Sequence, residues 1–264
     1  MTTAASSGLV TYSLPLLAVT PVHRELAVCG QYGVLLASSD EERAAIYRLR
    51  FQVFNLELNE GLEASFATGE DKDEFDSVCE HIYVQHRMTG EVVGTYRVQS
   101  GVTAAAKLGY YSEREFVLAP FEPLRGQILE LGRACIDRKH RSFEVLNLLW
   151  RGLAIYARRV NARYLLGCSS LTSQDPAEGW EVYQQLSMFL AGPELRTVPT
   201  PEYDMPPTAP KEGAKVPRLL RAYLSVGSQI CGPPGLDRDF KTIDFLTLLD
   251  FEKLSPAAKA RFLR

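Results

Sequence analysis

Two charged side chains, Glu130 and Arg133, interrupt Ile128–Ile136, a stretch whose other residues are typical of a buried β-strand. A charge that leaves water is costly unless it is paired, so the two groups indicate either a structural ion pair or a reactive site. Residues three apart in a regular strand point to opposite faces. The two groups therefore share a site only if a bulge breaks the alternation, and Gly132 lies where a bulge is expected.

The neighbouring elements place this stretch inside a mixed sheet. Apolar residues recur with helical spacing over Phe143–Arg159, and an apolar strand follows at 164–169. A strand, a helix and a strand in this order predict a parallel pair with a right-handed crossover. Upstream, His81–His86 and Val92–Gln99 flank a turn and predict an antiparallel hairpin. The expected fold is α/β (α+β), with the hairpin first, the parallel pair in the middle and flanking helices.

The chain is expected to form one domain with extensions at both ends. Residues 1–30 are small, polar and interrupted by prolines, and are interpreted as an N-terminal arm. Residues 31–264 form the domain, which begins with a strand near Tyr32. Its part from 191 to 264 is interpreted as a C-terminal extension.

Two segments before the hairpin are expected to border the site. Ser39 and Glu42 form a capping-box pattern that opens a helix through about Leu56. Residues 57–80 are acidic and irregular, which is typical of a mobile loop or of short helices over a site. This segment is a candidate lid.

The composition favours a cytoplasmic protein, either free or peripheral at a membrane. The chain has 264 residues, 46% of them hydrophobic, and its net charge of −3 gives no global case for nucleic acid. The five cysteines contain no Cys-x-x-Cys, and the four histidines have no metal-ligand spacing, so we expect no disulfide framework and no metal. No apolar stretch approaches the roughly 18 residues that a bilayer requires.

Four short motifs occur in one order along the chain. They are Arg50-x-x-x-Phe54, Asp73-Glu74-Phe75-Asp76, Gly94-Thr95-Tyr96-Arg97 and Glu130-Leu131-Gly132-Arg133. Together they resemble the GNAT-fold acyl-ACP-dependent N-acyltransferases. These comprise the acyl-homoserine-lactone synthases, the N-acyl amino acid synthases and the ornithine N-acyltransferases of ornithine-lipid synthesis. The last group is the most similar, and the resemblance extends over roughly residues 32–264.

The resemblance implies an enzyme that moves a long-chain acyl group, with or without a 3-hydroxyl, from acyl-ACP to the α-amine of an amino acid. Ornithine is the leading acceptor, because the long C-terminal part favours the lipid branch. N-acyl amino acid synthesis and acyl-homoserine-lactone synthesis are the alternatives within the class. A non-catalytic module that binds an acyl carrier or a membrane surface is the alternative outside it. The oligomeric state stays open.

This reaction requires a base, because an ammonium must lose a proton before it attacks a thioester. Glu130 is the candidate base, since burial raises a carboxyl pKa while a nearby arginine lowers it. Arg133 corresponds to an arginine of the site region in the lactone-synthase relatives. A Glu130–Arg133 ion pair that fixes the bulge is the alternative. Backbone N–H groups around Cys135 and Ile136 are candidates for holding the oxyanion.

Five further motif residues and one residue of the Phe143–Arg159 helix are candidate substrate contacts: Arg50, Phe54, Asp73, Asp76, Arg97 and Trp150. The arginines, together with Arg133, offer planar guanidinium groups to the amino-acid carboxylate. The aspartates either receive a cationic group of the substrate or pair with the arginines and close the acidic segment. The two aromatic residues either contact the acyl chain or belong to the core.

The turn before the Phe143–Arg159 helix is basic and contains no glycine. In the acetyl-CoA branch of the GNAT fold, a glycine-rich turn holds a diphosphate here. The absence of this glycine-rich turn is consistent with a donor that has no nucleotide diphosphate, namely acyl-phosphopantetheine on the carrier protein. We expect the enzyme to bind no cofactor of its own. Basic residues at both ends of the helix are candidates for docking the acidic carrier: Arg138, Lys139, Arg141, Arg158 and Arg159. A solvated charged turn is the alternative.

Overall fold

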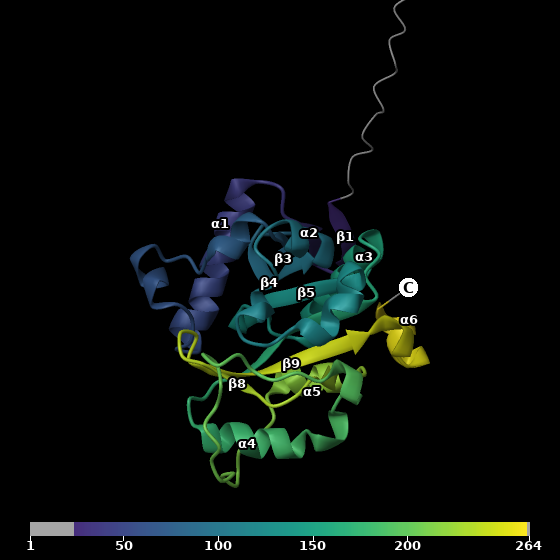
Figure 1. Cartoon of the computed structure of the whole chain (residues 1–264). Helices are drawn as coiled ribbons and strands as arrows, with labels where there is room; N and C mark the ends of the chain where they lie inside the picture. The colour runs from purple at the N-terminus through teal and green to yellow at the C-terminus, as the bar shows by residue number, and fades with distance from the viewer. Residues whose placement is uncertain (1–23, 263–264) are drawn as a thin grey trace, which may run out of the picture.

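The computed structural model describes residues 24–262, which form a nine-stranded sheet flanked by helices (Figure 1). In spatial order the strands are β1 (Glu25–Cys29), β2 (Tyr32–Leu36), β3 (Glu80–His86), β4 (Val92–Ser100), β5 (Ile128–Ile136), β6 (Tyr164–Leu171), β9 (Thr242–Asp250) and β7 (Gln229–Ile230), with β8 (Gly235–Asp237) also on β9. All neighbouring strands are antiparallel except β5 and β6. The mixed sheet with a central parallel pair confirms the predicted fold class.

Six α-helices lie among the described residues: α1 (Asp40–Phe51), α2 (Gly101–Ala106), α3 (Phe143–Arg159), α4 (Pro176–Gln185), α5 (Arg218–Ser225) and α6 (Pro256–Phe262). Helix α3 packs on one face of the sheet, where Leu149 meets Ile82 and Val84 in the main core. Helix α1 packs on the other face, where Ile46 meets Tyr83. Successive side chains of β3 therefore point to opposite faces of the sheet. No helix in the described range is long and apolar enough to cross a membrane.

Local signals explain why α1 and α3 begin where they do. Ser39 accepts a hydrogen bond from the backbone of Glu42, whose side chain reaches back to the cap, so the predicted capping box is present. Ser142 caps α3 in the same way, through the backbone N–H of Val145. Helix α1 then continues into a π-helical segment, Gln52–Glu57, which the sequence pattern does not predict.

The start of the domain differs from the prediction. Residues 25–29, assigned to the arm, form β1, because this short segment pairs with β2 and therefore belongs to the sheet. The remainder of the arm, residues 1–23, lies outside the described residues. Helix α4 ends at Gln185, and a single 3-10 turn follows it.

Short 3-10 helices connect the larger elements: Glu63–Ala67, Glu74–Ser77, Tyr111–Glu113, Ala119–Gln127, Arg138–His140, Ser187–Phe189, Pro193–Leu195 and Phe251–Lys253. The first two lie in the acidic segment 57–80, as expected for short helices over a site.

Candidate active site

The parallel strands β5 and β6 separate in the middle of the sheet. Their pairing ends at Glu130 and Leu166, although β5 continues to Ile136 and β6 to Leu171. Beyond this point β5 pairs with β4 and β6 pairs with β9. Gly167 lies at the opening, where a Cβ would stand 2.2 Å from the carbonyl oxygen of Leu131. The absence of a side chain at Gly167 therefore permits the close approach from which the strands diverge.

A bulge lies in β5 directly after the divergence. Between the pairs Thr95–Cys135 and Arg97–Gly132, β5 contains one residue more than β4. The predicted bulge is therefore confirmed, but the residue in the left-handed region is Arg133, with φ 51°, and not Gly132. Because of the extra residue, the side chains of Glu130 and Arg133 lie on the same side of β5, where both contact the segment around Tyr111.

A cavity of about 690 Å³ lies at the separated strands and is lined by residues of β4, β5, β6 and α3. Its apolar part follows α3 from Phe143 to Ala154, a distance of about 16 Å along the helix axis. It continues over α5 and the segment around Leu254. Its polar part contains carboxylates that are buried in the fold: Glu60, Glu115, Glu130, Asp237 and Asp244.

Glu130 is fixed by the backbone of the short 111–113 helix. One carboxylate oxygen accepts the N–H of Tyr111 at 2.9 Å and the other accepts the N–H of Ser112 at 2.8 Å. Burial raises the pKa of Glu130 above its ordinary value, although these hydrogen bonds and Arg97 oppose the increase. No ion pair joins Glu130 to Arg133 among the residues that the structure describes.

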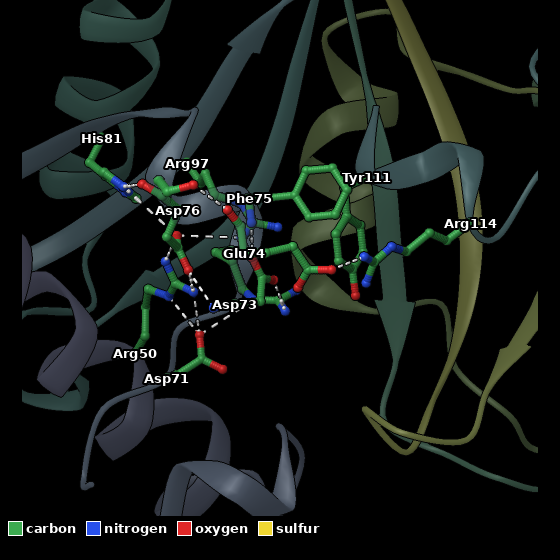
Figure 2. A network of polar contacts seen from close by, with 12 residues as sticks. Arg50, Asp71, Asp73, Glu74, Phe75, Asp76, His81, Arg97, Tyr111 and Arg114 are labelled. Carbon is green, nitrogen blue, oxygen red and sulfur yellow. Dashed lines mark hydrogen bonds and ion pairs between the residues drawn. The ribbon is translucent and has the colours of Figure 1, made fainter. Parts of the chain in front are cut away.

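Three arginines from α1, β4 and β5 meet three aspartates of the acidic segment. Figure 2 shows two of them, Arg50 and Arg97, beside these aspartates. Arg50 binds Asp71 at 2.6 Å and Asp76 at 2.7 Å. Asp73 accepts hydrogen bonds from Arg97 at 2.6 Å and from Arg133 at 2.9 Å.

This buried network joins the acidic segment to the sheet and to α1. Burial alone would raise the pKa of Asp76, but Arg50 and Arg97 hold it well below its ordinary value. Beside it, burial lowers the pKa of His81 to about 4.

The network corresponds to the structural alternative stated for the aspartates, which was that they pair with Arg50 and Arg97. It also shows that residues 57–80, expected to be a mobile loop or short helices over a site, have a part inside the fold, since Asp71, Phe75 and Asp76 are buried. The reason is that each acidic side chain finds a buried guanidinium, which offsets the cost of leaving water. The sequence motifs do not predict that Asp71 is a partner of Arg50.

The two aromatic candidates both line the cavity. Phe54 lies in the π-helical segment and packs edge-to-face on Phe240, with ring centroids 5.6 Å apart. Trp150 of α3 stacks on Tyr223 of α5 at 5.6 Å, and its indole N–H donates to the hydroxyl of Tyr96. Each ring therefore belongs to a packed cluster and to the cavity wall at the same time.

The candidate docking residues fall into two groups. Arg138, Lys139 and Arg141 are exposed in the turn before α3, while Arg158 and Arg159 are exposed at its far end, about 25 Å away along a helix of 17 residues. Arg141 also forms an ion pair with Glu57 at 2.6 Å. The first group borders the cavity, which is lined by Arg141 itself and by the next residues, Ser142 and Phe143. A single compact patch is therefore not formed.

Three buried acids that line the cavity are not part of the sequence motifs: Glu115, Asp237 and Asp244. Each offers a carboxylate oxygen, and these oxygens all lie within 4.8 Å of one another. The sequence contains a signal for one of them, because Asp244 interrupts the apolar strand β9 just as Glu130 interrupts β5. The other two acids lie in irregular or very short segments, where an acidic residue is ordinary.

Comparison with known proteins identifies the family. A profile of the acetyltransferase (GNAT) domain matches residues 49–151. Over 247 residues, 86% of each chain, the protein is 30% identical to an L-ornithine N(alpha)-acyltransferase of Brucella abortus (strain 2308). The chain belongs to the L-ornithine N(alpha)-acyltransferase family. A member of this family from Agrobacterium fabrum (strain C58 / ATCC 33970) is 29% identical over 86% of this chain and 84% of its own length.

Solved structures agree with this family's fold. The acyl-homoserine-lactone synthase LasI superposes with a TM-score of 0.52 over 88% of this chain and 94% of its own, at 13% identity. The predicted GNAT fold and the predicted N-acyltransferase class are thereby confirmed. An L-ornithine N(alpha)-acyltransferase family member of this fold is an enzyme that transfers an acyl group to an amino acid.

Proposed function

We propose that the protein transfers a long-chain acyl group, with or without a 3-hydroxyl, from acyl-ACP to the α-amine of ornithine. The amine nitrogen attacks the thioester carbonyl, an amide bond forms, and the carbon–sulfur bond breaks. The ammonium loses two protons as it becomes the amide: one passes through a base to the departing thiolate, and the other is released to water. One observation carries the proposal: in a chain 30% identical to an L-ornithine N(alpha)-acyltransferase, a single cavity joins an apolar groove along α3 to a carboxylate-lined part.

Glu130 is the proposed base, acting directly or through water. A carboxylate has about four acceptor positions, and the two backbone N–H groups of Tyr111 and Ser112 occupy only some of them. Its raised pKa brings it closer to the range in which a base accepts a proton efficiently. Arg97 and Arg133 retain N–H groups beyond those that bind Asp73, and these donors are the proposed contacts for the acceptor carboxylate.

The carrier protein is the proposed donor because the cavity is lined by Arg141, Ser142 and Phe143, beside the basic turn. Phe143 is 76% exposed, and Arg138 and Lys139 are exposed before it. An acidic carrier protein that docks on this turn would place its phosphopantetheine at that part of the cavity.

The test of the acceptor uses purified full-length protein with palmitoyl-ACP or palmitoyl-CoA. The amino-acid panel contains ornithine, lysine, glutamine and glycine, with S-adenosylmethionine as a separate acceptor. Mass spectrometry should find N-palmitoyl-ornithine as the main product, formed faster from the ACP donor. Absence of any N-acyl product would refute the enzyme function, and a main product from S-adenosylmethionine would assign the chain to lactone synthesis.

The test of docking uses a charge reversal at each end of α3. Arg138→Glu combined with Lys139→Glu should raise the apparent KM for palmitoyl-ACP and leave the KM for palmitoyl-CoA unchanged. Arg158→Glu combined with Arg159→Glu is the matched control, because it makes the same charge change at the far end of the helix. Equal effects of the two reversals would remove the basic turn as the docking site.

A further inference from the structure

Three carboxylates converge in the polar part of the cavity. Glu115 follows the short helix that Glu130 holds, Asp237 ends β8, and Asp244 lies in β9. Their exposed fractions are 1%, 2% and 3%, and one oxygen of each lies within 4.8 Å of the others. Segments distant in the sequence thus bring three acids to one point of the substrate cavity.

The fold holds two of these carboxylates in place and leaves acceptor atoms unused. One oxygen of Asp237 accepts the backbone N–H groups of Asp239 and Phe240. One oxygen of Asp244 accepts the hydroxyl of Thr242 at 3.0 Å. By contrast, Oε2 of Glu115 and Oδ1 of Asp244 are buried without a hydrogen-bond partner.

A buried carboxylate without a partner is costly, so a pair of unused oxygens in a cavity indicates a missing donor. Among residues 24–262, no ion pair involves Glu115, Asp237 or Asp244. The nearby cation Arg133 is already bound to Asp71 and Asp73.

The electrostatic state of the cluster is consistent with an absent cation. Burial and the neighbouring acids raise the pKa of Glu115 well above its ordinary value. Burial, reinforced by Asp237, raises the pKa of Asp244 to about 7. Near neutral pH the cluster therefore retains protons that a bound cation would displace, and it carries fewer charges than three free carboxylates. An ammonium can donate hydrogen bonds to carboxyl oxygens in either protonation state, whereas a divalent metal ion binds the ionised form.

We propose that Glu115, Asp237 and Asp244 form the subsite that binds the terminal ammonium of the acceptor's side chain, and so select a diamino acid over a neutral one. An ammonium has three N–H donors, which matches three convergent carboxylates. This proposal rests on the proposed function, because it assigns the second amine of the acceptor to a site in the same cavity. It leaves the α-amine for the candidate base, Glu130.

The test compares two acceptors that differ only in this amine. Norvaline has the carbon chain of ornithine without the side-chain amine, so the ratio of their kcat/KM values measures the subsite. With palmitoyl-ACP as donor, wild type should prefer ornithine. Asp244→Asn and Glu115→Gln should each lower the ornithine-to-norvaline ratio by at least about 30-fold, the loss expected when a buried charge pair loses one partner. Values for norvaline itself should change little.

The matched control is Asp239→Asn, which removes an exposed acid two residues from Asp237 and should leave the ratio unchanged. If Asp244→Asn and Glu115→Gln reduce activity toward both acceptors equally, the proposed subsite is wrong. If either variant fails to fold, wild type with lysine and 2,4-diaminobutyrate serves instead. The subsite predicts lower kcat/KM for both, and equal values for all three diamino acids would overturn it.

Two further outcomes separate the proposals. Wild type that acylates ornithine and norvaline equally well would refute the subsite and leave the acyltransfer intact, whereas wild type that acylates neither would refute the proposed function. Elemental analysis addresses a metal at the same carboxylates. A stoichiometric divalent metal in wild type that is absent from Asp244→Asn, together with loss of activity toward both acceptors in EDTA, would overturn the ammonium assignment.

Discussion

The buried arginine–aspartate network predicts a large loss of stability when Asp73 is removed. Its side chain is only 7% exposed and binds Arg97 and Arg133, whose side chains are 4% and 8% exposed. It also caps the Glu74–Ser77 helix by accepting the N–H of Phe75. In Asp73→Ala, two buried guanidinium groups lose a partner, which costs about 3–5 kcal/mol, and loss of the cap costs about 1 kcal/mol.

The measurement is urea unfolding followed by circular dichroism, which should show a decrease of about 4–6 kcal/mol in the free energy of unfolding. Glu74→Ala is the matched control, because Glu74 is the next residue and also binds an arginine, Arg114. Its side chain is 55% exposed and that of Arg114 is 43% exposed, so the expected cost is less than about 1 kcal/mol.

A double-mutant cycle with Arg97→Met then isolates one pair of the network. Residues in direct contact usually show interaction energies of about 0.5–3 kcal/mol, and a buried pair at 2.6 Å should lie at the upper end. Equal destabilisation by Asp73→Ala and Glu74→Ala, or additive effects of Asp73→Ala and Arg97→Met, would refute the idea that the network anchors the acidic segment.

Three other substitutions test separate features. In wild type the pKa of Asp244 rises on folding from 3.8 to about 7, so the free energy of unfolding should fall as pH increases between these values. Between pH 5 and pH 8, Asp244→Asn should lose roughly 3 kcal/mol less of this free energy than wild type does. Identical pH profiles of the two proteins would refute this. Gly167→Ala should cost about 1–3 kcal/mol by thermal unfolding, whereas Gly132→Ala, with no atom within 4 Å of its Cβ, should cost much less. Glu130→Gln should lose about 1–3 kcal/mol in urea, because the amide would face a backbone N–H; unchanged stability would show that the carboxylate does not hold residues 111–113.

Much of the fold could be predicted because its signals are local. Helix α3 and strand β5 have the predicted bounds, since a capping serine and apolar periodicity define the first, and an apolar run defines the second. Strand β1 was missed because a five-residue segment becomes a strand only through its pairing with β2. The π-helical end of α1 has no comparable local signal.

The site was predictable only where one motif contained its chemistry. The spacing of Glu130 and Arg133 predicts a bulge, and the structure contains one. The position of the left-handed residue was not predictable, because glycine is the usual occupant and Arg133 adopts this conformation instead. The pairing of Asp71 with Arg50 and the group of Glu115, Asp237 and Asp244 depend on contacts between distant segments, which the sequence pattern does not reveal.

The pairing of β6 with β9 has a consequence for the order in which the protein becomes active during synthesis. Gly167 faces Thr247, eighty residues later in the chain, and beyond Leu166 this ladder holds β6 after it leaves β5. A nascent chain that ends before Thr242 therefore lacks both this support and Asp244. The four motifs from Arg50-x-x-x-Phe54 to Glu130-Leu131-Gly132-Arg133 all precede residue 134. The ribosome thus completes these four motifs well before the cavity can close, and acyl transfer has to wait for the last strand.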